Sequence, residues 1–186
     1  MAAMAGPDPL DIYPTQADPT SWLEQLEQGV TGMRIAYSPD YGHARVDPEI
    51  AAASRRSAEM LQQLGASVEE VSIDFSDCRD AFLTLWDAAI GRTLTDVPTD
   101  RWALSDPGLV ATCERGAHIT AQQFLDADAV RAQATLRLNH LLTSYDLLMS
   151  PQLPLTAFAL GSDVADPSTQ SHWIDWSPFT YPRSEE

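Results

Sequence analysis

The chain has 186 residues, a formal net charge of −16 and 44% hydrophobic residues. This length suits one domain or one piece of a larger domain, and the apolar content is sufficient for a buried core. All 11 basic residues are arginines, so the sequence contains no lysine. The negative charge disfavours nucleic acid and anionic membranes as partners. The missing lysine excludes a P-loop, a lysine Schiff base and a serine–lysine dyad formed by this chain alone.

Targeting signals, cysteines and histidines add further exclusions. No apolar run approaches the roughly 20 residues that cross a bilayer, and residues 1–8 lack the charged and apolar regions of a secretory signal. We therefore expect a cytoplasmic protein. Cys78 and Cys113 form no C-x-x-C pair, and two reduced, buried thiols are favoured over a disulfide. The histidines show no pair at ligand spacing and no dinucleotide fingerprint is present, so we expect neither a metal nor a cofactor.

Local signals in the first third of the chain predict a strand, a helix and a second strand at about 33–73. Residues 1–19 are rich in proline and predict an extended connection, followed by a short helix that ends at Gly29. Residues 33–37 are a compact apolar strand. Asp47 and the proline after it predict the start of a helix, and Gly65 predicts its end. Apolar residues at helical spacing predict its buried stripe: Ile50, Ala53, Met60, Leu61 and Leu64.

The second strand of this unit is expected around Val68, Val71 and Ile73. Strand, helix and strand at this spacing predict a right-handed βαβ crossover with parallel strands. Ligands of such sheets often lie beyond the carboxyl ends of the strands, which makes His43 a candidate for a small-molecule site. The alternative, which we favour, is a surface loop residue beside Tyr41.

Helices are expected at about 77–144. One amphipathic pattern runs from Phe82 to Leu94 and is ended by Pro98, and a weaker one covers 109–115. Thr120, with a glutamine three residues later, has the signature of a capping box. The helix that follows has a predicted buried stripe: Ala134, Leu138, Leu141, Leu142 and Tyr145.

The end of the chain changes character. Residues 146–149 predict a buried strand, and residues 151–186 are rich in proline and aromatic residues and are expected to form loops. Trp173 and Trp176 could form a stacking platform, but packing in a core or an interface is favoured because few basic residues lie nearby.

Four segments stand out by their order and separation: MAGPDP from Met4, GMRIAYSPDYG from Gly32, YDLLMSPQLP from Tyr145 and WSPFTYP from Trp176. Together they resemble the amidase signature family, whose members hydrolyse amide bonds. The resemblance implies an α/β fold in which a mixed sheet is covered by helices. The chain would then be one partial amidase domain with three parts: an extended connection (1–19), an α/β and helical portion (20–150) and a loop-rich end (151–186).

Members of this family use a lysine, a bridging serine and a serine nucleophile, and the matching segments begin after all three. We therefore expect no catalytic residue here and a chain truncated at both ends. The resemblance places residues of two loops nearest to the pocket that would hold a small-molecule amide in the intact enzyme: Pro151, Gln152, Leu153, Phe179 and Thr180. Proline-stiffened loops packed on the sheet are the alternative for these positions.

Two functions remain open at this level. The first is a fragment of an amidase that is inactive alone, because acyl transfer needs an activated nucleophile and oxyanion donors. The second is a noncatalytic chain that docks with a separately encoded amidase half, or that acts as a binding module. A free-standing domain with a site near His43 is the weakest of the alternatives.

Overall fold

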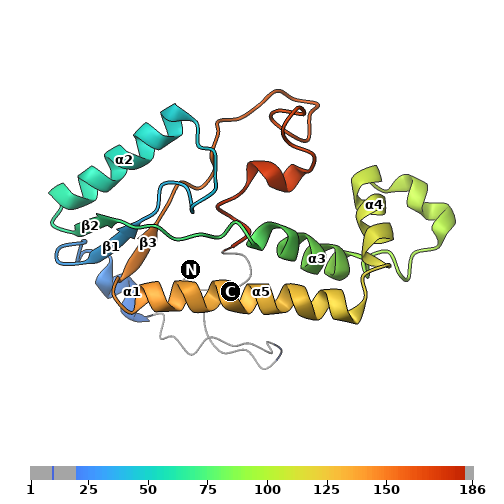
Figure 1. Cartoon of the computed structure of the whole chain (residues 1–186), viewed down its shortest axis with the longest axis horizontal. Coiled ribbons are helices and arrows are strands. Elements are labelled where there is room, and N and C mark those ends of the chain that lie inside the picture. The colour runs from blue at the N-terminus through green and yellow to red at the C-terminus, as the bar shows by residue number, and fades with distance from the viewer. Residues whose placement is uncertain (1–9, 11–19, 183–186) are drawn as a thin grey trace.

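The computed structural model describes Leu10 and residues 20–182 (Figure 1). The expected connection at 1–19 therefore lies outside the described residues except for Leu10. No helix within the described ranges has the length and apolar character of a membrane span. The described elements, in chain order, are α1 (Thr20–Gln25), β1 (Arg34–Tyr37), α2 (Pro48–Gln63), β2 (Ser67–Glu70), α3 (Cys78–Ile90), a 3₁₀ helix (Thr99–Leu104), α4 (Pro107–Gly116), α5 (Ala121–Leu142), β3 (Leu147–Met149) and a 3₁₀ helix (Trp173–Trp176).

The three described strands form a parallel sheet in the order β2-β1-β3. Ile35 in the central strand lies opposite Val68 on one side and Leu147 on the other. This confirms the α/β class and the βαβ unit. The second strand is shorter than predicted, because its pairing stops at Glu70. The next residue donates one more hydrogen bond, to the carbonyl of Tyr37, and the chain then leaves the sheet.

The ends of α2 follow the local signals. Asp47 caps the helix by accepting a hydrogen bond from the backbone N–H of Glu49 at 2.8 Å, and proline occupies the next position. Gly65 follows the helix with a φ of +97°, a conformation that a side chain would strain. Both predicted boundaries are confirmed.

The predicted buried stripe of α2 is wrong in part. Met60 and Leu64 are 61% and 59% exposed, whereas the buried residues of the helix are the small Ser54 and Ala58. Small side chains let the helix approach its neighbours closely. Met60 and Leu64 lie to the side of the surface that α2 buries, and no described segment covers them.

Helix α3 ends at Ile90 and does not continue through Leu94 as predicted. Gly91 follows the helix and packs against Gly116 of α4, where a Cβ atom on Gly116 would collide with the carbonyl oxygen of Asp87. Leu94 is still only 6% exposed, since the turns after Gly91 carry it back toward the protein interior. Leu94 thus has the helical spacing of a buried residue although it lies beyond the end of α3, which is why the predicted helix was too long. The weaker helical pattern is confirmed by α4.

The capping box of α5 is confirmed. Thr120 Oγ1 accepts from the N–H of Gln123 at 3.2 Å, and the side chain of Gln123 accepts from the N–H of Thr120 at 2.9 Å. Burial again falls short of the prediction: Leu142 is 39% exposed, and Leu147 in the expected buried strand β3 is 47% exposed. We call Leu142 and Leu147 the open face, because both are partly exposed leucines that line one shallow pocket between α5 and β3.

The core lies beside the sheet, where four segments meet. Tyr41 follows β1, Phe75 follows β2, Phe82 lies on α3, and Phe179 and Tyr181 come from the last described segment. The Tyr41 ring is 5.0 Å from that of Phe75 and 5.1 Å from that of Phe179, both at edge-to-face angles. These five residues, each between 0% and 7% exposed, form what we call the aromatic core.

Candidate functional site

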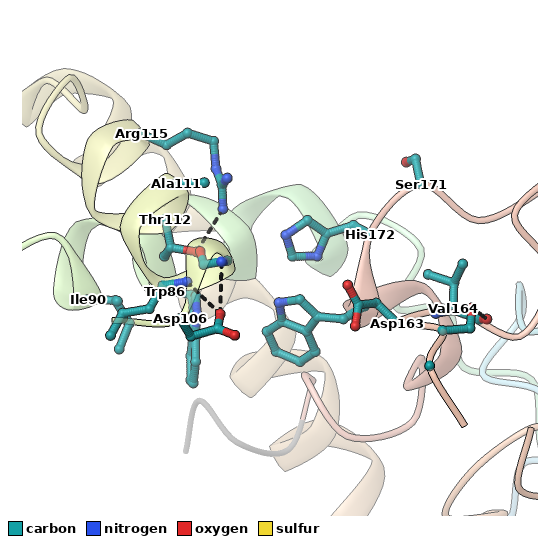
Figure 2. Close-up of a pocket in the computed structure, with 15 residues that line it drawn as sticks. Trp86, Ile90, Asp106, Ala111, Thr112, Arg115, Asp163, Val164, Ser171 and His172 are labelled. Carbon is teal, nitrogen blue, oxygen red and sulfur yellow. Dashed lines mark hydrogen bonds between the residues drawn. The ribbon is translucent and has the colours of Figure 1, made fainter. Parts of the chain in front are cut away.

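A cleft of about 750 Å³ opens between α3, α4 and the loop 161–173 (Figure 2). The helices contribute Trp86, Ile90, Thr112 and Arg115 on one side, and the loop contributes residues such as His172 on the other. We call it the tryptophan cleft, and its lining includes Trp86, Ile90, Thr112, Arg115, His172 and Trp173.

Arg115 is fixed in this cleft by a paired carboxylate. Its Nε and Nη2 donate to the two carboxylate oxygens of Asp87 at 2.8 and 3.2 Å, and Nη2 also donates to Thr112 Oγ1 at 3.0 Å. Asp87 is only 8% exposed. The hydrogen bonds to Asp87 raise the pKa of Arg115, so its charge is permanent but largely balanced.

His172 is held as a neutral ring. Its Nδ1 accepts a hydrogen bond from the backbone N–H of Ile174 at 3.3 Å, while the carboxylate of Asp175 accepts from the backbone N–H of His172 at 2.9 Å. Burial lowers the pKa of His172, and the nearby positive charge of Arg115 lowers it further. The proton of the ring therefore lies on Nε2 at neutral pH.

Two indoles form the apolar wall of the cleft. The ring centroids of Trp86 and Trp173 are 5.5 Å apart at an interplanar angle of 64°. Phe82, from the aromatic core, stacks on Trp86 at 5.6 Å and meets Trp173 edge-on at 6.4 Å. The cleft wall is thus a continuation of the core, and the expected packing role of Trp173 is confirmed.

A second cleft, of about 660 Å³, lies between the loop after β1, the start of α3 and the C-terminal segment. We call it the histidine cleft, and its lining includes His43, Arg45, Arg79, Pro154, Asp175 and Tyr181. His43 Nδ1 donates to the carbonyl oxygen of Tyr41 at 2.9 Å, and Nε2 lies 3.0 Å from the Tyr181 hydroxyl. His43 is half-buried, and whether it binds a ligand stays a prediction.

The charges of the histidine cleft are also paired. Arg79 Nη2 lies 2.6 Å from Asp175 Oδ1. Burial alone would raise the pKa of Asp175, but the hydrogen bonds from Arg79 and two backbone N–H groups outweigh it and lower this pKa. Burial raises the pKa of Tyr181 to about 12, so the phenol stays protonated.

Neither cleft carries an activated nucleophile. Within Leu10 and 20–182, no serine hydroxyl is hydrogen-bonded to a histidine ring, and no three His, Cys, Asp or Glu residues are grouped to hold a metal ion. Cys78 and Cys113 are buried free thiols, which agrees with the reduced state expected for them. Burial and the neighbouring Asp77 raise the pKa of Cys78 to about 12, so its thiolate is scarce.

The five positions assigned to the substrate pocket lie in two loops next to the histidine cleft. Pro151 is buried, Gln152 is exposed and Leu153 is half-buried. Phe179 is part of the aromatic core, and Thr180 donates a hydrogen bond to the carbonyl of Ser177 at 2.8 Å. None of the five lines either cleft, but the adjoining Pro154, Pro178 and Tyr181 line the histidine cleft. Their role at a pocket stays a prediction.

Sequence reasoning missed the tryptophan cleft. Trp86 lies within the amphipathic pattern predicted from Phe82 to Leu94, and no local pattern predicts a role for Arg115 or His172. One local signal was present: His172 and Asp175 form a capping box at the last 3₁₀ helix, at the usual spacing. Nothing in the sequence indicates that this turn faces α3 and α4.

Comparisons with known proteins place the chain in a family. A family model described as "Amidase" matches residues 1–184. An acylamidase from Rhodococcus erythropolis is 28% identical over 96% of this chain and 39% of its own length. A glutamyl-tRNA(Gln) amidotransferase subunit from Syntrophomonas wolfei is 27% identical over 89% of the chain and 39% of its own length.

The fold agrees with these sequence matches. The crystal structure of a bacterial aryl acylamidase of the amidase signature family superposes with a TM-score of 0.79 at 22% identity, over 97% of this chain and 40% of that one. The chain thus spans about two fifths of each of these relatives. Because the family model covers nearly every residue, the chain belongs to the amidase, or amidase signature, family.

Proposed function

We propose that these residues are a pocket-covering part of a hydrolase that cleaves non-peptide amide C–N bonds, and that they are inactive alone. The observation that carries the proposal is the family match over residues 1–184 in a chain without a lysine, which spans 39% of the acylamidase. The residues that activate the nucleophile must then come from elsewhere, either in a longer chain or in a second one.

The physical argument for inactivity is strong. Hydrolysis of an amide needs an activated nucleophile and donors that stabilise the oxyanion. Removing a nucleophilic residue from such a unit typically costs about a millionfold in turnover. In each cleft an arginine is paired with an aspartate: Arg115 with Asp87, and Arg79 with Asp175. Groups fixed in this way are suited to positioning a substrate.

Within this proposal, the loops at 151–153 and 179–180 border the substrate. Both adjoin the histidine cleft, whose walls include Pro154 and Pro178. The amide substrate would enter from the side of the histidine cleft that carries His43 and Arg45. Substitution of Leu153 by Trp should then obstruct substrate in the complete enzyme and raise KM, with little effect on unfolding of this chain.

A chimera tests the proposed function. The 186 residues are joined to the part of the Rhodococcus acylamidase that precedes its matching region, and hydrolysis of simple amides is measured for the chimera and for the chain alone. We expect turnover only from the chimera, and none when its donor-derived nucleophile is replaced by alanine. Reproducible turnover by the purified chain alone would sink the proposal and require a mechanism without lysine.

The second candidate, a noncatalytic chain docked to a separate amidase half, is favoured by one observation. The open face presents Leu142 and Leu147 at 39% and 47% exposure, which suits contact with a second chain such as the one implied by the Syntrophomonas relative, itself one subunit of its enzyme. Sequencing the coding region upstream separates the two candidates. A Gly/Ser-rich stretch with a lysine in the same reading frame favours one enzyme, whereas a separate reading frame favours docking. The cytoplasmic location stays a prediction, which cell fractionation would test.

A further inference from the structure

The tryptophan cleft combines an aromatic wall with neutral hydrogen-bond donation, and nothing above gives it a ligand. We propose that it binds a planar aromatic ring attached to a neutral carbonyl, as in an aromatic carboxamide. The tryptophan cleft is separate from the histidine cleft, beside which the proposed function places the bond that is cleaved, so this is a second ligand site. Only the choice of a carboxamide rests on the proposed function. The aromatic ring and the neutral acceptor are argued from the cleft itself.

The aromatic wall is prepared for a flat ligand. Trp86 is 39% exposed although Phe82 stacks against it at 5.6 Å with an interplanar angle of 21°. Trp86 is one of the residues that line the cleft, so part of its exposed surface faces this space. Trp173 stands at 64° to Trp86 and forms a corner with it. A planar ring in this corner meets one indole face-on and the other edge-on, the two geometries that aromatic pairs favour.

The donor is the ring of His172. Because Nδ1 accepts from the N–H of Ile174, the proton lies on Nε2, which donates to no described residue. Figure 2 shows the His172 ring between the loop and the α4 side chains Thr112 and Arg115. A carbonyl oxygen in the cleft can accept from Nε2–H.

The charges of the cleft select a neutral acceptor over an anion. Arg115 is the positive group of the lining, and the carboxylate of Asp87 already balances it. Asp106 and Asp163 also line the cleft and add negative charge. A carboxylate ligand would meet this negative potential, whereas a carboxamide would not.

Indole N–H signals in NMR spectra of the purified chain provide the test. Benzamide is the probe, and cyclohexanecarboxamide and benzoate are its matched controls, which remove the aromatic ring and the neutral carbonyl group in turn. We expect benzamide to shift the signals of Trp86 and Trp173 but not that of Trp102, which bonds to the carbonyl of Val97 outside the cleft. Each control should bind about fivefold more weakly.

Two variants sharpen the assignment. Trp173→Leu removes one indole, and His172→Phe keeps a flat ring but removes the donor; each should weaken benzamide about fivefold. Trp102→Phe is the matched control and should bind benzamide like the unsubstituted chain. If no cleft signal shifts, or if the three probes bind equally well, the proposal is wrong. The same holds if both cleft variants bind benzamide unchanged while retaining a cooperative unfolding transition.

This test is independent of turnover. An active chimera whose chain leaves the indole signals unmoved by benzamide would retain the proposed function and remove this inference. Selective benzamide binding together with an inactive chimera would retain this inference and remove the proposed function.

Discussion

The aromatic core and the open face are both built from large hydrophobic side chains but differ in what covers them. The core joins four segments, and its Tyr41 and Phe179 are 1% and 0% exposed. The open face lies on α5 and β3, and its Leu147 is 47% exposed although it belongs to a parallel sheet, a structure that is normally covered on both faces. Within the described residues, one side of the sheet is therefore covered more fully than the other.

Phe179→Ala is expected to have the largest effect on stability. Truncating a fully buried aromatic ring next to Tyr41 should lower the free energy of unfolding by about 3–5 kcal/mol. Denaturant-induced unfolding measures this loss. Because the chain could unfold entirely, Phe179→Leu should also be measured, and a loss between those of the parent and the alanine variant is expected.

The matched control is Phe124→Ala on α5, where the ring is 43% exposed. Its expected cost is about 1 kcal/mol or less. Similar losses for Phe124→Ala and Phe179→Ala would mean that the aromatic core is not where the stability of this chain resides.

Gly116→Ala should destabilise the corner between α3 and α4 by about 1–3 kcal/mol, because the added methyl group has no space beside the carbonyl of Asp87. Thermal or denaturant unfolding measures the change. The control, Glu114→Ala, alters an exposed residue of the same helix and should change stability by less than about 0.5 kcal/mol. A neutral Gly116→Ala would show that the two helices can separate at little cost.

The sequence predicted those features of the fold that are encoded locally. Asp47, Gly65 and Thr120 marked helix ends correctly, because caps and left-handed residues act over a few neighbours. It predicted burial poorly, because the exposure of Met60 or Leu147 depends on segments that are far away in the chain. The spacing of apolar residues indicates which side chains of a helix or strand share a face. It does not indicate whether another segment of the protein covers that face.

The candidate site was less predictable for the same reason. The tryptophan cleft joins residues of α3, α4 and a late loop, and each has an ordinary local context. The two loops at 151–153 and 179–180 came from the family resemblance, and the structure places them beside a cleft whose walls are mostly formed by other residues. Tertiary proximity of this kind leaves no periodic or motif signal in a single sequence.

The Asp175–Arg79 pair ties the last 3₁₀ helix to α3 and should make the core side of the molecule sensitive to acid. Since the folded-state pKa of Asp175 lies below its ordinary value of 3.8, its stabilisation is present above that value and is lost as the pH falls through the lower folded-state pKa. Asp175→Asn should cost about 1 kcal/mol at neutral pH. In unfolding experiments at a series of pH values, this difference should shrink below pH 3.8.

Glu59→Gln, on the exposed side of α2, is the control for this pH series and should show no comparable pH dependence. If the Asp175→Asn difference stays constant to the lowest pH, the carboxylate does not gain its stability from Arg79 and the backbone donors.

Leu147→Gln is expected to have the smallest effect on these residues alone, less than about 0.5 kcal/mol, because the side chain already meets solvent. The same substitution in an active chimera should cost more, since a leucine covered by the added segment contributes about 1.5–3 kcal/mol through burial. Unfolding of both proteins, each with and without the substitution, measures the difference. Leu104→Gln, at a residue 88% exposed outside the open face, should be neutral in both. Equal small effects of Leu147→Gln in both proteins would mean that the open face stays uncovered in an active amidase, and the comparison between the two regions would lose its explanation.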